Sequence, residues 1–288
     1  MWQGAYTALV TPFNRDGAVD YGKLRAIVEE QIAGGITGLV PVGTTGESPT
    51  VDFEEHSKII EVCIATARKR CKIVAGTGAN STREAIELTQ HAKDAGADAT
   101  LQVTPYYNRP SQAGLIKHFS AVADLGLPVI LYNVPGRTGR EIEVGTVVEL
   151  AKHPHIVALK EAGGSVDRVS QVAQRCNIEI LSGDDALTLP MMVVGAVGII
   201  SVASNVAPKP VADLVAAALR GDWPAAQALH KKYYPLFTDL FLDTNPVPVK
   251  AAMAMQGKIE EAYRLPLCEM AAAPRAKLAE TLKALGLI

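Results

Sequence analysis

Cysteine is scarce in this sequence, with four residues among 288 (Cys63, Cys71, Cys176 and Cys268) and no CxxC spacing. This pattern is typical neither of a disulfide-rich secreted scaffold nor of a cysteine zinc site, so we predict reduced thiols in a cytoplasmic protein. The first residues lack the basic segment and long apolar run of a secretory signal, and no such leader is expected. No segment has the roughly 18 consecutive apolar residues of a membrane-spanning helix.

An excess of charge of either sign is also missing. The chain has 28 Lys and Arg against 30 Asp and Glu, which gives a net charge of −2. Nucleic acids and anionic membranes attract basic surfaces, so neither is an expected partner. A small neutral or anionic metabolite remains possible, because local charge decides whether it binds.

Motifs for metals and phosphates are weak. Among the six histidines only His153 and His155 are close in the sequence, and they precede a predicted strand. The stretch 43–47 (GTTGE) lacks the GK[ST] ending of a P-loop, and 76–81 (GTGANS) lacks the third glycine of a dinucleotide fingerprint. We therefore expect no metal and no cofactor. The backbone N–H groups and two hydroxyls of 43–47 suit a small carboxylate better than a pyrophosphate.

Short apolar runs recur along the chain, and their lack of polar alternation is typical of strands buried on both faces of a parallel sheet. There are eight runs, at residues 6–13, 38–46, 72–78, 99–107, 128–136, 156–164, 179–185 and 198–204. Helical patterns separate them, so the chain is either a (β/α)8 barrel or a doubly wound sheet. The count of eight favours the (β/α)8 TIM barrel.

Helix boundaries and a change of pattern complete the organisation. Asp20 is expected to cap one helix, Asp52 with Glu55 begins a second, and Ser81 with Glu84 has the spacing of a capping box. After residue 220 only helical patterns remain. We predict a barrel over residues 1–220 and a C-terminal helical appendage over residues 221–288.

In such a barrel the active site lies at the carboxyl ends of the strands. The expected strand-end residues are Thr11, Thr44, Thr45, Asn80, Tyr106, Tyr107, Tyr132, Asn133, Lys160, Asp184, Asp185 and Ser201. Lys160 follows four apolar residues, and a poorly hydrated amine at this place can attack a ketone to form a Schiff base. The alternative is that Lys160 pairs with Glu161 or caps a helix. Glu161 is a poor partner, because adjacent strand residues point to opposite faces.

Tyr132 lies at the end of the preceding apolar run, at about the same distance along its strand as Lys160 along the next one. Its phenol could shuttle a proton for a carbinolamine at Lys160, or it could simply pack in the barrel mouth.

Several motifs together resemble the dihydrodipicolinate synthase (4-hydroxy-tetrahydrodipicolinate synthase) family of pyruvate-dependent class I aldolases. They are GTTGES (43–48), GTGANST (76–82), TPYYNRP (104–110), YNVPGRTG (132–139), LKEAGG (159–164), LSGDD (181–185), ISVASNV (200–206) and NPVPVK (245–250). Three of these are shared with relatives such as N-acetylneuraminate lyase, whereas Thr44-Thr45 together with GRTG is narrower and indicates the synthase.

The resemblance implies a lyase of lysine and diaminopimelate biosynthesis that condenses pyruvate with L-aspartate 4-semialdehyde. It implies that Lys160 forms the imine and that Tyr132 gives and accepts protons. It also implies that Thr44 links Tyr132 to a Tyr107 that crosses a dimer interface. Thr45, Gly183 and Ile200 would surround pyruvate, and Arg137 would hold the semialdehyde's carboxylate. The assembly would be a homotetramer, a dimer of dimers.

A feedback site for L-lysine is a further implication of the resemblance. The matching residues are Ser48, His56, Asn80, Glu84 and Tyr106, whereas Pro49 and Phe53 depart from the family pattern.

Two other functions remain open. Another aldolase on the same scaffold would cleave N-acetylneuraminate or a 2-keto-3-deoxy sugar acid, but the cation of Arg137 does not suit a polyhydroxylated aldehyde. The second is a binding or regulatory function of a barrel that has no catalytic activity.

Overall fold

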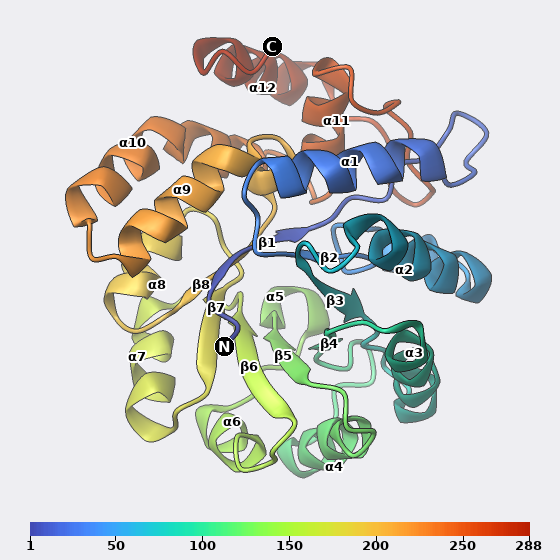
Figure 1. Cartoon of the computed structure of the whole chain (residues 1–288), viewed down its shortest axis with the longest axis vertical. Coiled ribbons are helices and arrows are strands. Elements are labelled where there is room, and N and C mark those ends of the chain that lie inside the picture. Colours follow the sequence, from blue (N-terminus) through green and yellow to red (C-terminus); the bar gives the residue numbers. More distant parts are fainter.

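Eight parallel strands form a closed barrel in the computed structural model, which describes all 288 residues (Figure 1). Each strand pairs with the next one in the sequence, and β8 pairs with β1. The strands are β1 (Gly4–Ala8), β2 (Gly38–Val40), β3 (Lys72–Gly76), β4 (Ala99–Val103), β5 (Val129–Asn133), β6 (Ile156–Glu161), β7 (Glu179–Ser182) and β8 (Gly198–Ser201). The barrel prediction is confirmed, and the doubly wound alternative is wrong.

Helices surround the barrel and continue beyond it. They are α1 (Tyr21–Ala33), α2 (Phe53–Ala67), α3 (Thr82–Ala95), α4 (Gln112–Ala123), α5 (Pro135–Thr138), α6 (Val144–Leu150), α7 (Val166–Arg175), α8 (Thr188–Val193), α9 (Pro208–Leu219), α10 (Trp223–Asp239), α11 (Val247–Met255) and α12 (Ala272–Ala284), with 3-10 turns η1 (Ser48–Thr50) and η2 (Ala203–Asn205). None of the helices combines the length and hydrophobicity that crossing a membrane requires.

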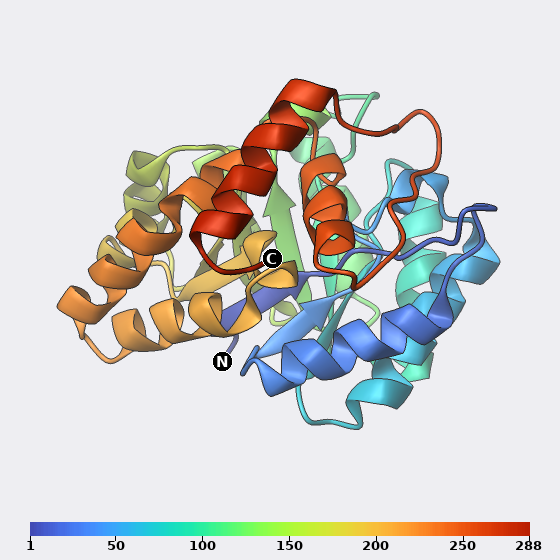
Figure 2. The same ribbon diagram turned by 90° about the horizontal axis from the view of Figure 1, so that it is seen from above.

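The C-terminal helices lie outside the ring of barrel helices. α10 packs on α9, and α11 and α12 lie side by side beyond α1 (Figures 1 and 2). The expected C-terminal helical appendage is therefore present, while the division of the chain at residue 220 stays a prediction.

Several strands are shorter than the apolar runs that predict them. The second run extends to Gly46, yet β2 ends at Val40. Val42 has a φ of 48°, a left-handed conformation that a strand does not contain, so the rest of the run forms a turn. Among the helix caps, Asp20 accepts from the Lys23 amide as expected.

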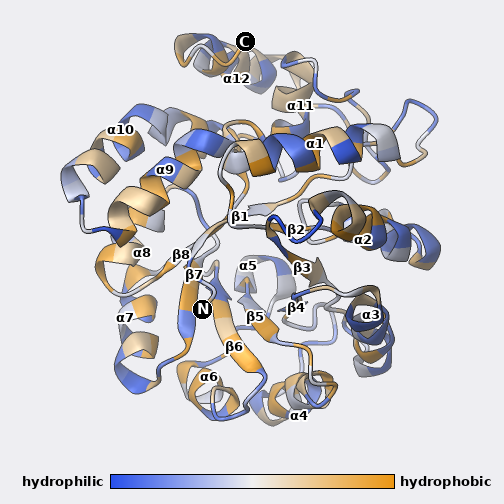
Figure 3. Ribbon diagram, in the orientation of Figure 1, coloured by the Kyte–Doolittle hydropathy of each residue, from blue (hydrophilic) through white to orange (hydrophobic).

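Two apolar layers divide the core, one inside the barrel and one between the strands and the helices. Figure 3 shows hydrophobic residues along β5 and β6. On β5, Ile130 and Tyr132 belong to the inner layer and Leu131 to the outer layer. On β6, Ala158 faces inward and Leu159 outward. This alternation follows from the two-residue period of a strand, and it directs every second side chain into the barrel.

A polar cluster behind β5 and β6 joins these two strands. Asn133 pairs in register with Glu161, and its Nδ2 donates to both carboxylate oxygens of Glu161 at 2.9 and 3.1 Å. The Arg168 Nε donates to the same carboxylate at 2.8 Å, and Arg168 also donates to the carbonyl of Ile142. All of these side chains are buried. The cluster therefore connects β5, β6, α7 and the segment between α5 and α6.

Replacing Arg168 by methionine should destabilise the fold, because Glu161 would keep a buried charge without its ionic partner. Removal of one member of a buried pair costs about 3–5 kcal/mol of unfolding free energy. As a control, Lys152→Met removes the exposed Lys152–Glu149 pair, and such pairs contribute about 0–1 kcal/mol. Urea unfolding followed by circular dichroism measures both variants. Equal effects of the two substitutions would contradict the structural role of the cluster.

Candidate active site

Lys160 and Tyr132 lie side by side at the carboxyl ends of β6 and β5. They are register partners in the sheet, and they are 5% and 6% exposed. The Lys160 Nζ lies 4.2 Å from the centroid of the Tyr132 ring, so the cation faces an aromatic surface. No carboxylate lies within ion-pair distance of this amine, and Glu161 binds Arg168 instead. Pairing of Lys160 with Glu161, the first alternative for its role, is therefore wrong.

Gly183 directly follows β7 and lies against the Lys160 side chain, and Ile200 lies on β8. A Cβ atom at position 183 would stand 2.6 Å from the Ala162 Cβ and 3.0 Å from the Lys160 Cε. A side chain at this position would therefore push directly against the lysine. Ile200 is fully buried in the inner apolar layer together with Tyr132.

The loop after β2 carries the two threonines. Thr44 lines a narrow cavity together with Gly43, Ser48 and Tyr132. Thr45 is buried, and its Oγ1 accepts from the Nδ2 of Asn245 at 3.0 Å. The loop therefore places one hydroxyl beside the tyrosine and binds the other to the C-terminal region.

Asn245 also contacts the arginine that the sequence singles out. Arg137 lies on α5 and is exposed, and its Nη2 donates to the carbonyl oxygen of Asn245 at 3.0 Å. Asn245 thus bridges Thr45 and Arg137, two of the expected substrate-binding residues. Sequence reasoning missed this role, although the NPVPVK motif that begins with Asn245 was a signal for it.

Tyr107 does not join this group within a single chain. Its side chain is 92% exposed, its φ is 71°, and it makes no hydrogen bond to Thr44 or Tyr132. The expected link from Tyr132 through Thr44 to Tyr107 is therefore not formed inside one chain.

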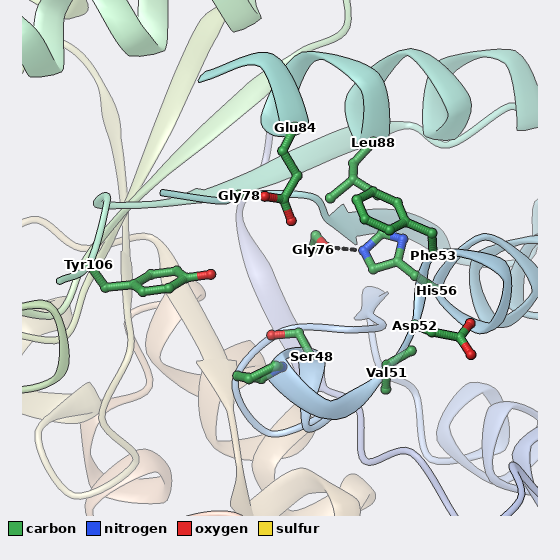
Figure 4. Close-up of a pocket in the computed structure, with 11 residues that line it drawn as sticks. Ser48, Val51, Asp52, Phe53, His56, Gly76, Gly78, Glu84, Leu88 and Tyr106 are labelled. Carbon is green, nitrogen blue, oxygen red and sulfur yellow. Dashed lines mark hydrogen bonds between the residues drawn. The ribbon is translucent and has the colours of Figure 1, made fainter. Parts of the chain in front are cut away.

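A larger cavity of about 470 Å³ opens on the other side of Ser48, between α2 and α3 (Figure 4). It is lined by Ser48, Pro49, Val51, Asp52, Phe53, His56, Gly76, Gly78, Glu84, Leu88 and Tyr106. Four residues of the expected lysine site are among these, whereas Asn80 does not line the cavity. Asn80 instead accepts through its carbonyl from the Asn108 Nδ2 at 2.8 Å.

The carboxylate of Glu84 points into this cavity, toward the side of Tyr106 and Ser48 (Figure 4). The capping box predicted for Ser81 and Glu84 is therefore wrong, and the Ser81 side chain accepts no helix N–H. The box predicted for Asp52 and Glu55 is present at the start of α2.

His56 lines the cavity but offers it no free ring nitrogen. Its Nε2 donates to the Gly76 carbonyl at 2.8 Å, and its Nδ1 is buried, without a partner and without exposure to the cavity. Burial lowers the pKa of His56, so the ring is neutral near pH 7. Burial, assisted by the nearby Glu84, raises the pKa of Tyr106, which stays a neutral phenol. The cavity thus offers the Glu84 carboxylate and the neutral Tyr106 phenol, which suit an ammonium group.

Comparison with known proteins gives close matches over the full chain. A 4-hydroxy-tetrahydrodipicolinate synthase of Geotalea daltonii is 51% identical over the full length of both chains. The chloride-inhibited dihydrodipicolinate synthase from Acinetobacter baumannii, solved in complex with pyruvate, is 47% identical with a TM-score of 0.98 and full coverage of both chains. The synthase from Cyanidioschyzon merolae, solved with lysine bound, is 38% identical with a TM-score of 0.97, and the match covers 100% of this chain and 99% of that one.

A match to a family model likewise covers nearly the whole chain. The dihydrodipicolinate synthetase family model matches residues 1–285. The chain, with its lysine-bearing barrel, therefore belongs to the dihydrodipicolinate synthetase family.

Proposed function

We propose that this chain is a lyase that condenses pyruvate with L-aspartate 4-semialdehyde to 4-hydroxy-tetrahydrodipicolinate, through an imine at Lys160. The relatives at about half identity carry the name of this synthase over their whole length. The assignment of the imine to Lys160 rests on its surroundings. Lys160 lies at the carboxyl end of β6 and is 5% exposed, and its Nζ lies 4.2 Å from the centroid of the Tyr132 ring without a carboxylate partner.

The chemistry follows from an amine beside a phenol. The Lys160 amine attacks the C2 carbonyl of pyruvate, and water leaves as the imine forms. Loss of a methyl proton gives an enamine, which attacks the aldehyde carbon of the second substrate. The amino group of that substrate then attacks C2 and releases Lys160 as the ring closes. Tyr132 is the proposed donor and acceptor of protons in these steps, since its side chain lies against the amine.

Thr45, Gly183 and Ile200 form the proposed pyruvate site. Gly183 leaves room beside the Lys160 stem, and Thr45 offers a hydroxyl held by Asn245. Thr44 is the proposed link in proton transfer, since it lines the same cavity as Tyr132.

Arg137 is the proposed clamp for the carboxylate of the semialdehyde. Its guanidinium is exposed, and the Asn245 carbonyl holds one of its nitrogens at 3.0 Å, which leaves other N–H groups for a carboxylate. A polyhydroxylated sugar-acid aldehyde offers no negative charge for this fork, so the arginine favours the synthase over a sugar-acid lyase.

A homo-oligomer, a tetramer built as a dimer of dimers, is the proposed assembly. Tyr107 is exposed and held in a left-handed conformation, as expected of a side chain that enters a neighbour's site. A cytoplasmic location is our proposal for a biosynthetic enzyme with four free thiols.

L-Lysine is the proposed occupant of the cavity around Glu84, where it would inhibit the reaction. Glu84 offers a charge for an ammonium group, and the Tyr106 phenol offers an oxygen for a hydrogen bond. Phe53 lies at the wall and can pack against the aliphatic stem. Ser48 lines this cavity and also the cavity beside Tyr132, so the two sites share a wall through which they can be coupled.

Incubation with pyruvate and sodium borohydride should add one pyruvyl-derived mass, located on Lys160 by peptide mass spectrometry. Lys160→Ala should remain unlabelled, because no other amine meets pyruvate at the end of a barrel strand. Lys152→Ala, a surface lysine variant, serves as the control and should be labelled like the wild type. Full labelling of Lys160→Ala would exclude the proposed imine.

Replacement of Arg137 by alanine should lower kcat/KM for the semialdehyde while imine formation with pyruvate persists. Loss of a charge-assisted hydrogen bond costs about 1.5–3 kcal/mol, or roughly 10- to 150-fold in kcat/KM. Arg140→Ala, in the same loop, is the matched control. An unchanged value for Arg137→Ala would refute the clamp.

Tyr107→Phe should lower kcat by about 100-fold or more, as expected for a lost proton-transfer group, with no change in unfolding temperature. Tyr234→Phe, another exposed tyrosine, should have no effect. Sedimentation should find at least a dimer in the active enzyme. A fully active monomer would contradict the contribution of Tyr107 to a neighbour's site.

Titration with L-lysine to millimolar concentration should inhibit the wild-type enzyme. Glu84→Gln removes the charge but keeps the shape, and should raise the half-inhibitory concentration about tenfold. Glu87→Gln lies on the same helix but does not line the cavity, so it should leave the half-inhibitory concentration unchanged. A flat wild-type curve would show that the cavity does not bind lysine as an inhibitor.

A further inference from the structure

A buried ion pair connects the C-terminal region to the loop after β2. Lys250, on α11, is 0% exposed, and its Nζ lies 2.5 Å from Oε1 of Glu47, which is itself 2% exposed. The ring of Phe13 lies 4.2 Å from the same amine. The proposed reaction uses neither member of this pair. Because Lys250 is fully buried, pyruvate cannot reach its amine, and Lys250 is not a second site of imine formation.

Glu47 stands at one end of a strained loop. Its φ is 55°, and Val42, five residues earlier, has a φ of 48°. Left-handed conformations are unfavourable for such residues and persist only where surrounding contacts hold them. Thr44 and Thr45 lie between these two positions. Within the loop, the Glu47 amide donates to the Thr44 carbonyl at 3.1 Å, so displacement of Glu47 acts directly on Thr44.

The contacts that hold this loop come largely from the C-terminal region. The second carboxylate oxygen of Glu47 accepts from the backbone N–H of Arg264 at 3.3 Å. Asn245 donates to Thr45 at 3.0 Å. From the barrel side, Thr11 donates to the Gly46 carbonyl at 2.7 Å. The loop is therefore held at three successive residues, Thr45, Gly46 and Glu47, and at two of them, Thr45 and Glu47, the contacts come from the C-terminal region.

We propose that the buried Lys250–Glu47 pair is a positioning device, which holds the loop of Thr44 and Thr45 in the shape that the reaction requires. Because a buried carboxylate cannot leave its cationic partner without cost, Glu47 stays in place and its loop cannot relax. Lys250 and Glu47 act through the two threonines and do not touch the substrate. This inference rests on the proposed function of that loop.

Steady-state kinetics of Glu47→Gln and Lys250→Met test the proposal. Both variants should show a lower kcat, through Thr44, and a KM for pyruvate raised about tenfold, as for one weakened charge-assisted contact at Thr45. The KM for the semialdehyde should rise less than that for pyruvate, since Arg137 is bound through the backbone carbonyl of Asn245 and contacts neither Glu47 nor Lys250. The matched control is Lys258→Met, which removes another C-terminal pair (Lys258–Glu30, 2.6 Å). Neither residue has a hydrogen bond or ion pair with residues 42–47, so both KM values should stay unchanged.

A double variant separates positioning from stability. Glu47→Leu with Lys250→Met replaces the pair by apolar groups, which commonly restores the stability that either single change removes. We expect an unfolding temperature near that of the wild type together with the raised KM for pyruvate. Wild-type kinetics in this folded double variant would overturn the proposal and leave the pair with a structural role only.

Borohydride labelling in the same experiment distinguishes this failure from a failure of the proposed function. Labelling of wild-type Lys160 by pyruvate, together with unchanged kinetics in the variants, would refute only the positioning role. An absence of labelling in the wild type would refute the proposed function itself.

Discussion

The register between β5 and β6 is the constraint on which the candidate site depends. In this parallel pair Tyr132 lies opposite Lys160, and Asn133 lies opposite Glu161. The first pair faces the interior of the barrel, and the second lies behind the strands in contact with Arg168. A slip of one residue in β6 would exchange the two faces, burying Lys160 among the helices and bringing a carboxylate into the barrel. The polar cluster behind the sheet opposes such a slip.

The same arrangement accounts for a lysine at the end of an apolar strand. The walls around Lys160 are apolar or glycine, so no anion competes with a carbonyl substrate for the amine. The polar partners that a charged residue normally requires are kept on the outer face of the strand. The proposed substrate-binding groups lie on the loop after β2 and on α5, and Asn245 of the C-terminal region contacts both. The barrel thus supplies the proposed reactive amine, and segments outside it hold the surrounding groups.

Local sequence patterns predict much of this architecture. The eight apolar runs identify all eight strands, and Lys160 is conspicuous because it interrupts an apolar run at a strand end. The patterns fail where a run continues into a turn, as at Val42, and where a side chain points into a cavity and not back to the helix N-terminus, as for Glu84. They also fail for Asn245 and Lys250, whose contacts span about 200 residues of sequence. Periodicity carries no information on such pairs, although a lone lysine inside the apolar helix 247–255 indicates a buried partner.

The most direct test of an imine at Lys160 is a crystal structure of the wild-type enzyme after soaking with pyruvate. We predict continuous electron density from the Lys160 Nζ to C2 of the pyruvyl group, with the Tyr132 hydroxyl next to the adduct and Gly183 beside the lysine stem. Pyruvate bound without a covalent link while the enzyme is active, or joined to a different lysine, would contradict it.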